Sequence, residues 1–195
     1  MSLEIGRRVV HASGAVVPGA YLLDVHVLET GLVTWPAIQA LALVGLAVAI
    51  GLEAARLYGG LEHAIYDRLT REYEQDTVAG YAMYALSGTV TVLVFEPRLA
   101  VPAIFMLTLG DPVSGLLSSG ELRRVARPRV LVGMFVVSLL FALPFVPPAV
   151  AVVGALGAMV ADGVKPIIRG YVVDDNLTIP LVAAGGMWVA LFVLG

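Results

Sequence analysis

Seven apolar runs divide this sequence, and most are close to the length that a membrane-spanning helix needs. About 20 mostly apolar residues cross a bilayer, and charged residues, proline and glycine mark the breaks between spans. The first run, which Asp24 and His26 interrupt, and the sixth are the weakest. The pattern predicts an all-α, polytopic membrane bundle of about seven transmembrane helices, in one domain over residues 1–195. The runs are Val9–Leu28, Leu32–Leu57, Val78–Phe95, Leu99–Leu117, Val130–Val146, Pro148–Ile168 and Leu177–Leu194.

Composition supports an integral membrane protein and excludes several functions. Hydrophobic residues make up 59% of the chain and charged residues 14%, against about 25% charged residues in soluble domains; the mean hydropathy is +0.91. Cysteine is absent, which excludes disulfides and thiolate metal sites. A net charge of −3 gives no support to a nucleic-acid partner. Arg7 and Arg8 precede the first run as in a signal peptide, but no small-residue cleavage site follows, so this run is predicted to remain as a span.

The basic residues predict the orientation, because Lys and Arg accumulate in short cytoplasmic loops. With the N-terminus in the cytoplasm, only Arg98 of the 12 basic residues falls outside. The sequence therefore predicts a multi-pass protein whose N-terminus is cytoplasmic. The cytoplasmic basic residues are Arg7, Arg8, Arg56, Arg68, Arg71, Arg123, Arg124, Arg127, Arg129, Lys165 and Arg169.

The polar segment 58–76 lies between the second and third runs. Leu61, Ile65 and Leu69 recur in it every four residues, which is typical of one apolar helix face. An amphipathic helix in the membrane interface and an ordinary cytoplasmic helix both fit this pattern.

Two acids within apolar runs, Asp111 and Asp162, carry the functional interpretation. A carboxylate at mid-helix in a membrane costs roughly 2.5–3.5 kcal/mol on insertion scales, so it usually has a partner or faces a watery cavity. Small and hydroxyl residues follow Asp111 and predict a loop whose backbone N–H groups approach an anion closely. An acid before such a loop suggests Mg²⁺ and phosphate. The loop residues are Ser114, Gly115, Ser118, Ser119 and Gly120.

Other polar residues fall at the same cytoplasmic helix ends. Several acids together need a cation, and several arginines together favour phosphate. A Mg²⁺ nucleotide is their natural common ligand, with the metal on Asp111 and another carboxylate and the phosphates on arginines and loop amides. Simpler interpretations remain open: Arg7 as a topology anchor, Glu53 with Arg56 as a local ion pair, Asn176 as a helix cap, and the arginines of residues 123–129 as a contact to anionic lipid. The polar residues are Arg7, His11, Glu53, Arg56, Arg71, Glu74, Arg129, Asp174, Asp175 and Asn176.

Four short motifs resemble the CTP-dependent lipid kinases, which include dolichol kinase, phytol kinase and the CTP-dependent diacylglycerol kinase and are distantly similar to CDP-diacylglycerol synthases. The chain departs from the family at Ser118, where a glycine is usual, and at Arg129-Val-Leu-Val-Gly133, where Lys-Ser/Thr-x-Glu-Gly is common. The resemblance covers almost the whole chain, and its motifs are Arg7-Arg8-Val-Val-His11, Arg71-Glu-Tyr-Glu74, Gly110-Asp111-Pro112 and Asp175-Asn176-Leu-Thr-Ile-Pro180.

The resemblance implies CTP as phosphoryl donor, Mg²⁺ as cofactor and a lipid alcohol as acceptor, such as dolichol, another polyprenol or phytol, at the cytoplasmic face. The expected catalytic acids are Asp111, Asp162 and Glu74. Asp162 is favoured as metal ligand or base, because it lies at a helix end with apolar residues before it. Nucleotide binding is expected of Arg71, Arg129, Ser114, Ser118, Ser119, Asp175 and Asn176.

Two other functions fit the same residues. A cytidylyltransferase would make a CDP-lipid and release pyrophosphate. An ion-coupled transporter would use the acids for an ion, although the sequence has no internal repeat and its polar residues lie at one membrane side. The sequence does not decide which lipid is used, or whether the chain acts as a monomer or a homodimer.

Overall fold

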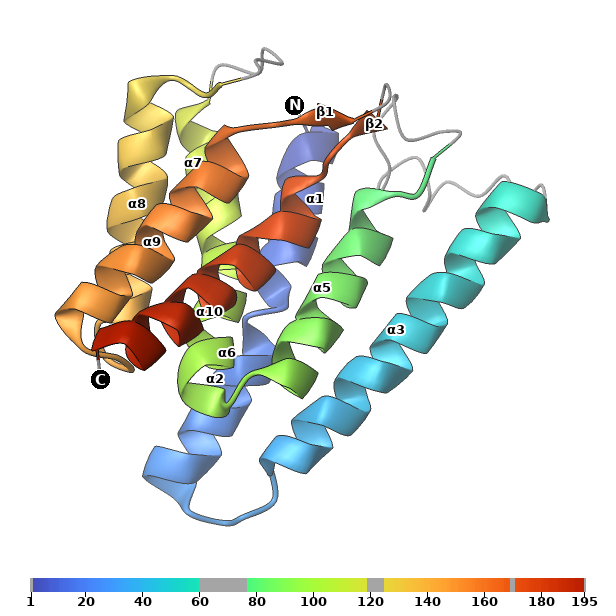
Figure 1. The fold of residues 1–195 in the computed structure, drawn as a ribbon. Helices are drawn as coiled ribbons and strands as arrows, with labels where there is room; N and C mark the ends of the chain where they lie inside the picture. The colour runs from blue at the N-terminus through green and yellow to red at the C-terminus, as the bar shows by residue number, and fades with distance from the viewer. Residues whose placement is uncertain (1, 60–76, 119–124, 169–170, 195) are drawn as a thin grey trace.

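The computed structural model describes residues 2–59, 77–118, 125–168 and 171–194, and these residues are almost entirely helical (Figure 1). In the described parts, the strands are the two-residue β1 (Ile167–Ile168) and β2 (Tyr171–Val172), which pair antiparallel. The predicted all-α class is confirmed. Residues 60–76 are not among the described residues. They include most of the predicted amphipathic segment 58–76, with Arg71 and Glu74.

The predicted first span is divided into three pieces. Helix α1 (Ser2–Ser13) is followed by α2 (Val16–Leu23) and the π-helix η1 (Asp24–Leu28). The break falls at Gly14, where a Cβ atom would lie 1.6 Å from the Tyr84 hydroxyl oxygen. Only glycine allows Tyr84 to approach the chain this closely.

The next two helices lie along one edge of the bundle (Figure 1). Helix α3 (Trp35–Tyr58) begins at Thr34, whose hydroxyl accepts a hydrogen bond from the Ala37 N–H at 3.3 Å, a favourable N-cap. Helix α5 (Gly80–Val94) packs against it.

Residues 97–117 form one continuous helical run through the centre of the bundle. Helix α6 (Pro97–Phe105) passes through the π-helix η3 (Met106–Gly110) into α7 (Asp111–Leu117). The expectation of a loop directly after Asp111 is therefore wrong for residues 111–117. Ser114 and Gly115 lie inside α7, and the helix ends at Ser118, which has an extended backbone.

The last three helices are α8 (Pro128–Ala142), α9 (Pro148–Gly163) and α10 (Asp175–Leu194). Glycines on α9 allow a close approach to α10, because a Cβ atom at Gly157 would lie 3.1 Å from the Val182 carbonyl oxygen. The core of the bundle is formed by fully buried side chains of α6, η3, α8 and α10. They include Leu99, Met106, Leu107, Met134, Ile179 and Met187.

Within the described ranges, three helical stretches are long and apolar enough to cross a membrane, by length and composition. They are α3, the run Pro97–Leu117 and α10. Helices α5, α8 and α9 are apolar but have 15, 15 and 16 residues. These properties agree with a membrane protein, and many large apolar side chains on α3 and α10 are exposed on the protein surface.

A buried ion pair joins α3 to the start of α5. Arg56 Nη2 lies 2.6 Å from Glu53 Oε1, and the two side chains are only 9% and 7% exposed. The Glu53 carboxylate also accepts hydrogen bonds from the Ala79 N–H at 2.8 Å and from the Tyr81 hydroxyl. Arg56 donates to the Thr77 carbonyl oxygen at 2.5 Å. Glu53 and Arg56 therefore form the local ion pair that the sequence analysis left open. Their hydrogen bonds also hold the start of α5 against α3.

We expect Glu53→Ala to lower the free energy of unfolding by about 3–5 kcal/mol, because it removes one partner of a buried ion pair and the acceptor of the Ala79 and Tyr81 hydrogen bonds. The matched control is Glu96→Ala, because Glu96 pairs with Arg98 at 2.5 Å but both side chains are at least half exposed. Exposed pairs contribute about 0–1 kcal/mol. Denaturant titration in detergent micelles measures both variants, and equal losses would contradict the role of the buried pair.

Candidate functional site

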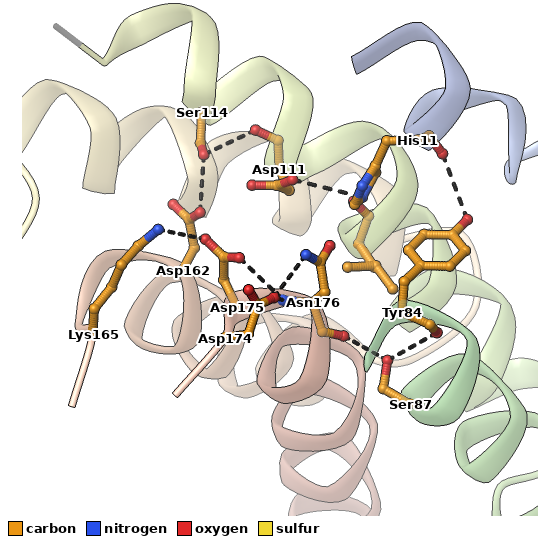
Figure 2. A network of polar contacts seen from close by, with 11 residues as sticks. His11, Tyr84, Ser87, Asp111, Ser114, Asp162, Lys165, Asp174, Asp175 and Asn176 are labelled. Atoms are coloured by element: carbon orange, nitrogen blue, oxygen red, sulfur yellow. Dashed lines mark hydrogen bonds and ion pairs between the residues drawn. The ribbon is translucent and has the colours of Figure 1, made fainter. Parts of the chain in front are cut away.

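Three aspartates from three helical segments meet at one end of the bundle (Figure 2). Asp111 is the first residue of α7, Asp162 lies in the last turn of α9, and Asp175 is the first residue of α10. Each offers a carboxylate oxygen that lies within 4.8 Å of the others. Asp162 and Asp175 are buried, whereas the Asp111 side chain is 22% exposed. We call these three residues the acid cluster.

The π-helix η3 determines where Asp111 points. The Asp111 N–H donates to the carbonyl oxygen of Met106, five residues back. One residue added to an α-helix rotates the later residues by about 100° around the helix axis. Asp111 and Ser114 therefore face α9 and α10, and π-bulges occur often at functional sites.

Among the described residues, a lysine, a histidine and a serine contact the acid cluster. Lys165 Nζ lies 2.7 Å from Asp175 Oδ2. His11 Nε2 lies 3.6 Å from Asp111 Oδ2 and 2.9 Å from the Leu107 carbonyl oxygen. The Ser114 hydroxyl bridges the cluster, at 3.0 Å from Asp162 Oδ1 and 3.1 Å from the Asp111 carbonyl oxygen. Among the described residues, Ser114 is the hydrogen-bond partner of the Asp162 carboxylate.

Asn176 lies beside the acid cluster with one polar atom unused. Its backbone N–H donates to Asp174 Oδ1 at 2.9 Å, and its Nδ2 donates to the same oxygen at 2.7 Å. Its backbone carbonyl oxygen accepts a hydrogen bond from the Ser87 hydroxyl at 2.5 Å. Its amide oxygen Oδ1 is buried and has no hydrogen-bond partner in the described part of the chain. Leaving a buried acceptor unsatisfied costs about 1–3 kcal/mol, so this oxygen is suited to a ligand.

Asn176 is not the residue that caps the last helix, because Asp174 has this role. The Asp174 carboxylate accepts the N–H of Asn176, as an N-cap side chain does. Asn176 is already inside α10. Its side chain is thus available for a role in the site.

Helix α1 covers the acid cluster from one side (Figure 2). The His11 ring packs edge-on against the Tyr84 ring, with centroids 4.8 Å apart. The Tyr84 hydroxyl donates to the His11 carbonyl oxygen at 3.5 Å. Arg8 Nη2 donates to the carbonyl oxygen of Gly115 on α7 at 3.0 Å. These contacts fix His11 above Asp111.

The structure brings together six of the residues that the sequence analysis selected. These are His11, Asp111, Ser114, Asp162, Asp175 and Asn176. Ser118 and Arg129 are exposed, and no contact in the described residues joins them to the acid cluster. Arg71, Glu74 and Ser119 lie outside the described residues, and so does the side chain of Arg7.

Sequence reasoning missed Tyr84, Ser87 and Lys165 as site residues. Lys165 carried a signal, because it is the only lysine of the chain and lies three residues after Asp162. Tyr84 and Ser87 sit in an apolar run, where hydroxyl residues are common and carry no such signal.

The donor set fits a hard divalent cation. Carboxylate and amide oxygens are the ligands that Mg²⁺ and Ca²⁺ prefer, and the acid cluster with Asn176 Oδ1 supplies four residues of this type. Three carboxylates that lie this close together favour a bound cation.

Comparison of this chain with protein-family models, with curated proteins and with solved structures finds no match.

Proposed function

We propose that this chain is a multi-pass membrane enzyme that transfers the γ-phosphoryl group of CTP to the hydroxyl of a lipid alcohol. The observation that carries the proposal is the acid cluster beside the orphaned oxygen of Asn176, at one end of an apolar bundle. A site made of oxygen ligands at the end of apolar helices suits the reaction of a charged nucleotide with a lipid. CTP as the donor is implied by the motif resemblance.

The proposed topology has about seven spans, with the N-terminus in the cytoplasm and the acid cluster at the cytoplasmic face. Lys165 and Arg8 contact Asp175 and α7, and Arg127 precedes α8 beside the end of α9, so all three lie at the same end of the bundle as the acids. Glu96 precedes α6 directly and Arg98 lies in its first turn, at the opposite helix ends. The strong bias of basic residues to one side supports this orientation.

Asp111, Asp162, Asp175 and Asn176 Oδ1 would hold Mg²⁺. When bound, the ion neutralises phosphate charge and orients the phosphoryl group for in-line transfer. The four residues come from α7, α9 and α10, so binding would also join three helices.

One bond forms and one bond breaks in the proposed transfer. The hydroxyl oxygen of the lipid forms a bond to the γ-phosphorus, and the bond from that phosphorus to the β–γ bridging oxygen breaks, so CDP leaves with the electron pair. The hydroxyl proton passes to a carboxylate, for which we propose Asp162. Its Oδ1 is held by the Ser114 hydroxyl, which orients the carboxylate as a base requires.

Each neighbour of the acid cluster has a proposed task. Lys165 contacts Asp175, and we propose that it contacts a phosphate oxygen instead when the nucleotide binds. His11 fixes Asp111 from above. Arg71 and Arg129 are proposed to bind the triphosphate, and Glu74 to contact the nucleotide.

The first prediction of the proposed function concerns the metal and needs no turnover. Mg²⁺ at 100 times its dissociation constant stabilises a protein by about 2.7 kcal/mol, which raises the unfolding temperature of a chain of this size by several degrees. We expect this shift in the wild-type protein and its loss in Asp111→Asn and Asp162→Asn. Glu96→Gln, at the opposite end of the bundle, keeps the full shift. An undiminished shift in both aspartate variants would exclude the acid cluster as the metal site.

The second prediction concerns the reaction. With purified protein, Mg²⁺ and a lipid alcohol such as dolichol, phytol or farnesol, we expect label from the γ-phosphate of CTP in the lipid and release of CDP. Asp162→Asn should lower the single-turnover rate on the order of 10²-fold or more. Label from the α-phosphate in the lipid, with phosphatidic acid as acceptor and pyrophosphate released, would instead identify a cytidylyltransferase. Solute transport without nucleotide turnover would identify a transporter.

A further inference from the structure

The first turn of α10 contains a backbone carbonyl that its own helix cannot satisfy. In an α-helix, the carbonyl oxygen of Asn176 accepts a hydrogen bond from the N–H four residues later. That residue is Pro180, which lies inside α10 and has no N–H. Asn176 and Pro180 are both buried, and a buried carbonyl oxygen needs a donor. The donor must therefore come from outside α10.

Ser87 of α5 supplies this donor. Its hydroxyl oxygen lies 2.5 Å from the Asn176 carbonyl oxygen and 3.2 Å from the carbonyl oxygen of Tyr84 on its own helix. A hydroxyl has one proton to donate, and the Asn176 oxygen is the closer acceptor. Ser87 is fully buried, and α5 packs against α10. The hydrogen bond therefore joins two packed helices through residues 89 positions apart in the sequence.

Asn176 lies between Ser87 and the acid cluster (Figure 2). Its backbone carbonyl faces Ser87, whereas its side-chain amide lies on the side of Asp111 and is held through Nδ2 by Asp174. Asp175, a member of the acid cluster, is in the same helical turn. A bond that holds the Asn176 carbonyl thus restrains the turn that carries two of the proposed metal ligands.

A similar arrangement occurs at the start of α7. The carbonyl oxygen of Leu107 would accept from Asp111 in an α-helix and from residue 112 in a π-helix. The Asp111 N–H donates to Met106 instead, and residue 112 is Pro112, which has no N–H. His11 Nε2 lies 2.9 Å from the Leu107 oxygen and donates to it, because a carbonyl can only accept. At both helices, a side chain from another helix replaces a donor that a proline lacks.

We infer that Ser87 is a positioning residue of the acid cluster. By bonding the carbonyl oxygen that Pro180 leaves without a helical donor, it fixes the first turn of α10, and with it Asn176 Oδ1 and the Asp175 carboxylate. The inference rests on the proposed function for the identity of the ligand, Mg²⁺. A hydroxyl on α5, a helix that carries no member of the acid cluster, then controls how tightly the cluster binds the ion.

A double-mutant cycle between Ser87 and Pro180 tests this inference. Ser87→Ala removes the hydroxyl. Pro180→Ala restores an N–H four residues after Asn176, so the hydroxyl is required only where the proline is present. The matched control is Ser138→Ala, because Ser138 is also a fully buried serine in an apolar helix, but its hydroxyl has no hydrogen-bond partner in the described part of the chain.

Two measurements are made in detergent micelles. The dependence of the unfolding temperature on Mg²⁺ concentration gives the dissociation constant of the ion. Amide hydrogen exchange of the peptide that contains residues 175–181, without Mg²⁺, reports on the first turn of α10 independently of the metal.

We expect Ser87→Ala to raise the Mg²⁺ dissociation constant about tenfold, because a buried carbonyl without a donor draws the turn out of position. In the Pro180→Ala background, the same substitution changes the constant by less than about twofold, and Ser138→Ala keeps the wild-type value. Hydrogen exchange is faster in Ser87→Ala and is unchanged when Ser87→Ala is added to Pro180→Ala. Ser87→Cys keeps a weaker donor and serves if Ser87→Ala does not fold; it raises the constant by a smaller factor.

The outcomes separate this inference from the proposed function. If the wild-type protein binds Mg²⁺ and Ser87→Ala binds it equally well, or weakens binding equally in both proline backgrounds, Ser87 does not position the acid cluster and the metal proposal stands. If the wild-type protein does not respond to Mg²⁺ but hydrogen exchange shows the proline-dependent effect of Ser87→Ala, the metal proposal fails and the link from Ser87 to α10 holds. Hydrogen exchange of α10 that is insensitive to Ser87→Ala overturns the inference whatever Mg²⁺ does.

Discussion

Three carboxylates within 4.8 Å of one another cannot all be ionised in apolar surroundings without a compensating positive charge. At this separation two carboxylates repel by about 3–4 kcal/mol at an effective dielectric constant near 20. Lys165 stabilises Asp175 directly, and Ser114 gives Asp162 one hydrogen bond. A cation held between the three carboxylates would offset their mutual repulsion, which is the physical basis for proposing a metal site.

The fold creates this position by departing from regular helix geometry at two places. The π-helix before Asp111 turns its side chain toward α9 and α10. The break at Gly14 lets Tyr84 enter against the chain, and Tyr84 in turn packs on His11 above Asp111. A regular α-helix through residues 106–110 would place Asp111 on a different face. Both departures serve contacts of the acid cluster, which agrees with a functional and not merely structural origin.

The sequence predicted those features that depend on local chemistry. Prolines begin α6, α8 and α9, so the predicted runs match these helices within a few residues at their starts. Asp111 and Asp162 were found because an acid in an apolar run is costly. The contact between Ser114 and Asp162 joins residues 48 positions apart, and it depends on helix packing that no local pattern encodes. The prediction of a loop directly after Asp111 was wrong for a related reason. Ser114 and Gly115 are weak helix formers, but packing of α7 against α8 and α1 outweighs their low helix propensity.

Helix length explains how a charged site and a lipid chain can meet. Helices α5, α8 and α9 have 15 or 16 residues and are about 22–24 Å long at 1.5 Å per residue, whereas the hydrocarbon core is about 30 Å thick. In the proposed orientation, with their outer ends level with the outer interface, their cytoplasmic ends lie several ångströms below the inner headgroups or the bilayer thins around them. Asp162 is at such an end. The hydroxyl of the proposed lipid substrate would then need little displacement from its resting depth to reach the carboxylate, and the larger movement would fall to the phosphates of the proposed nucleotide. Their entry to this depth would require positive charge nearby, and Arg8 and Lys165 lie on α1 and after α9, beside the acid cluster.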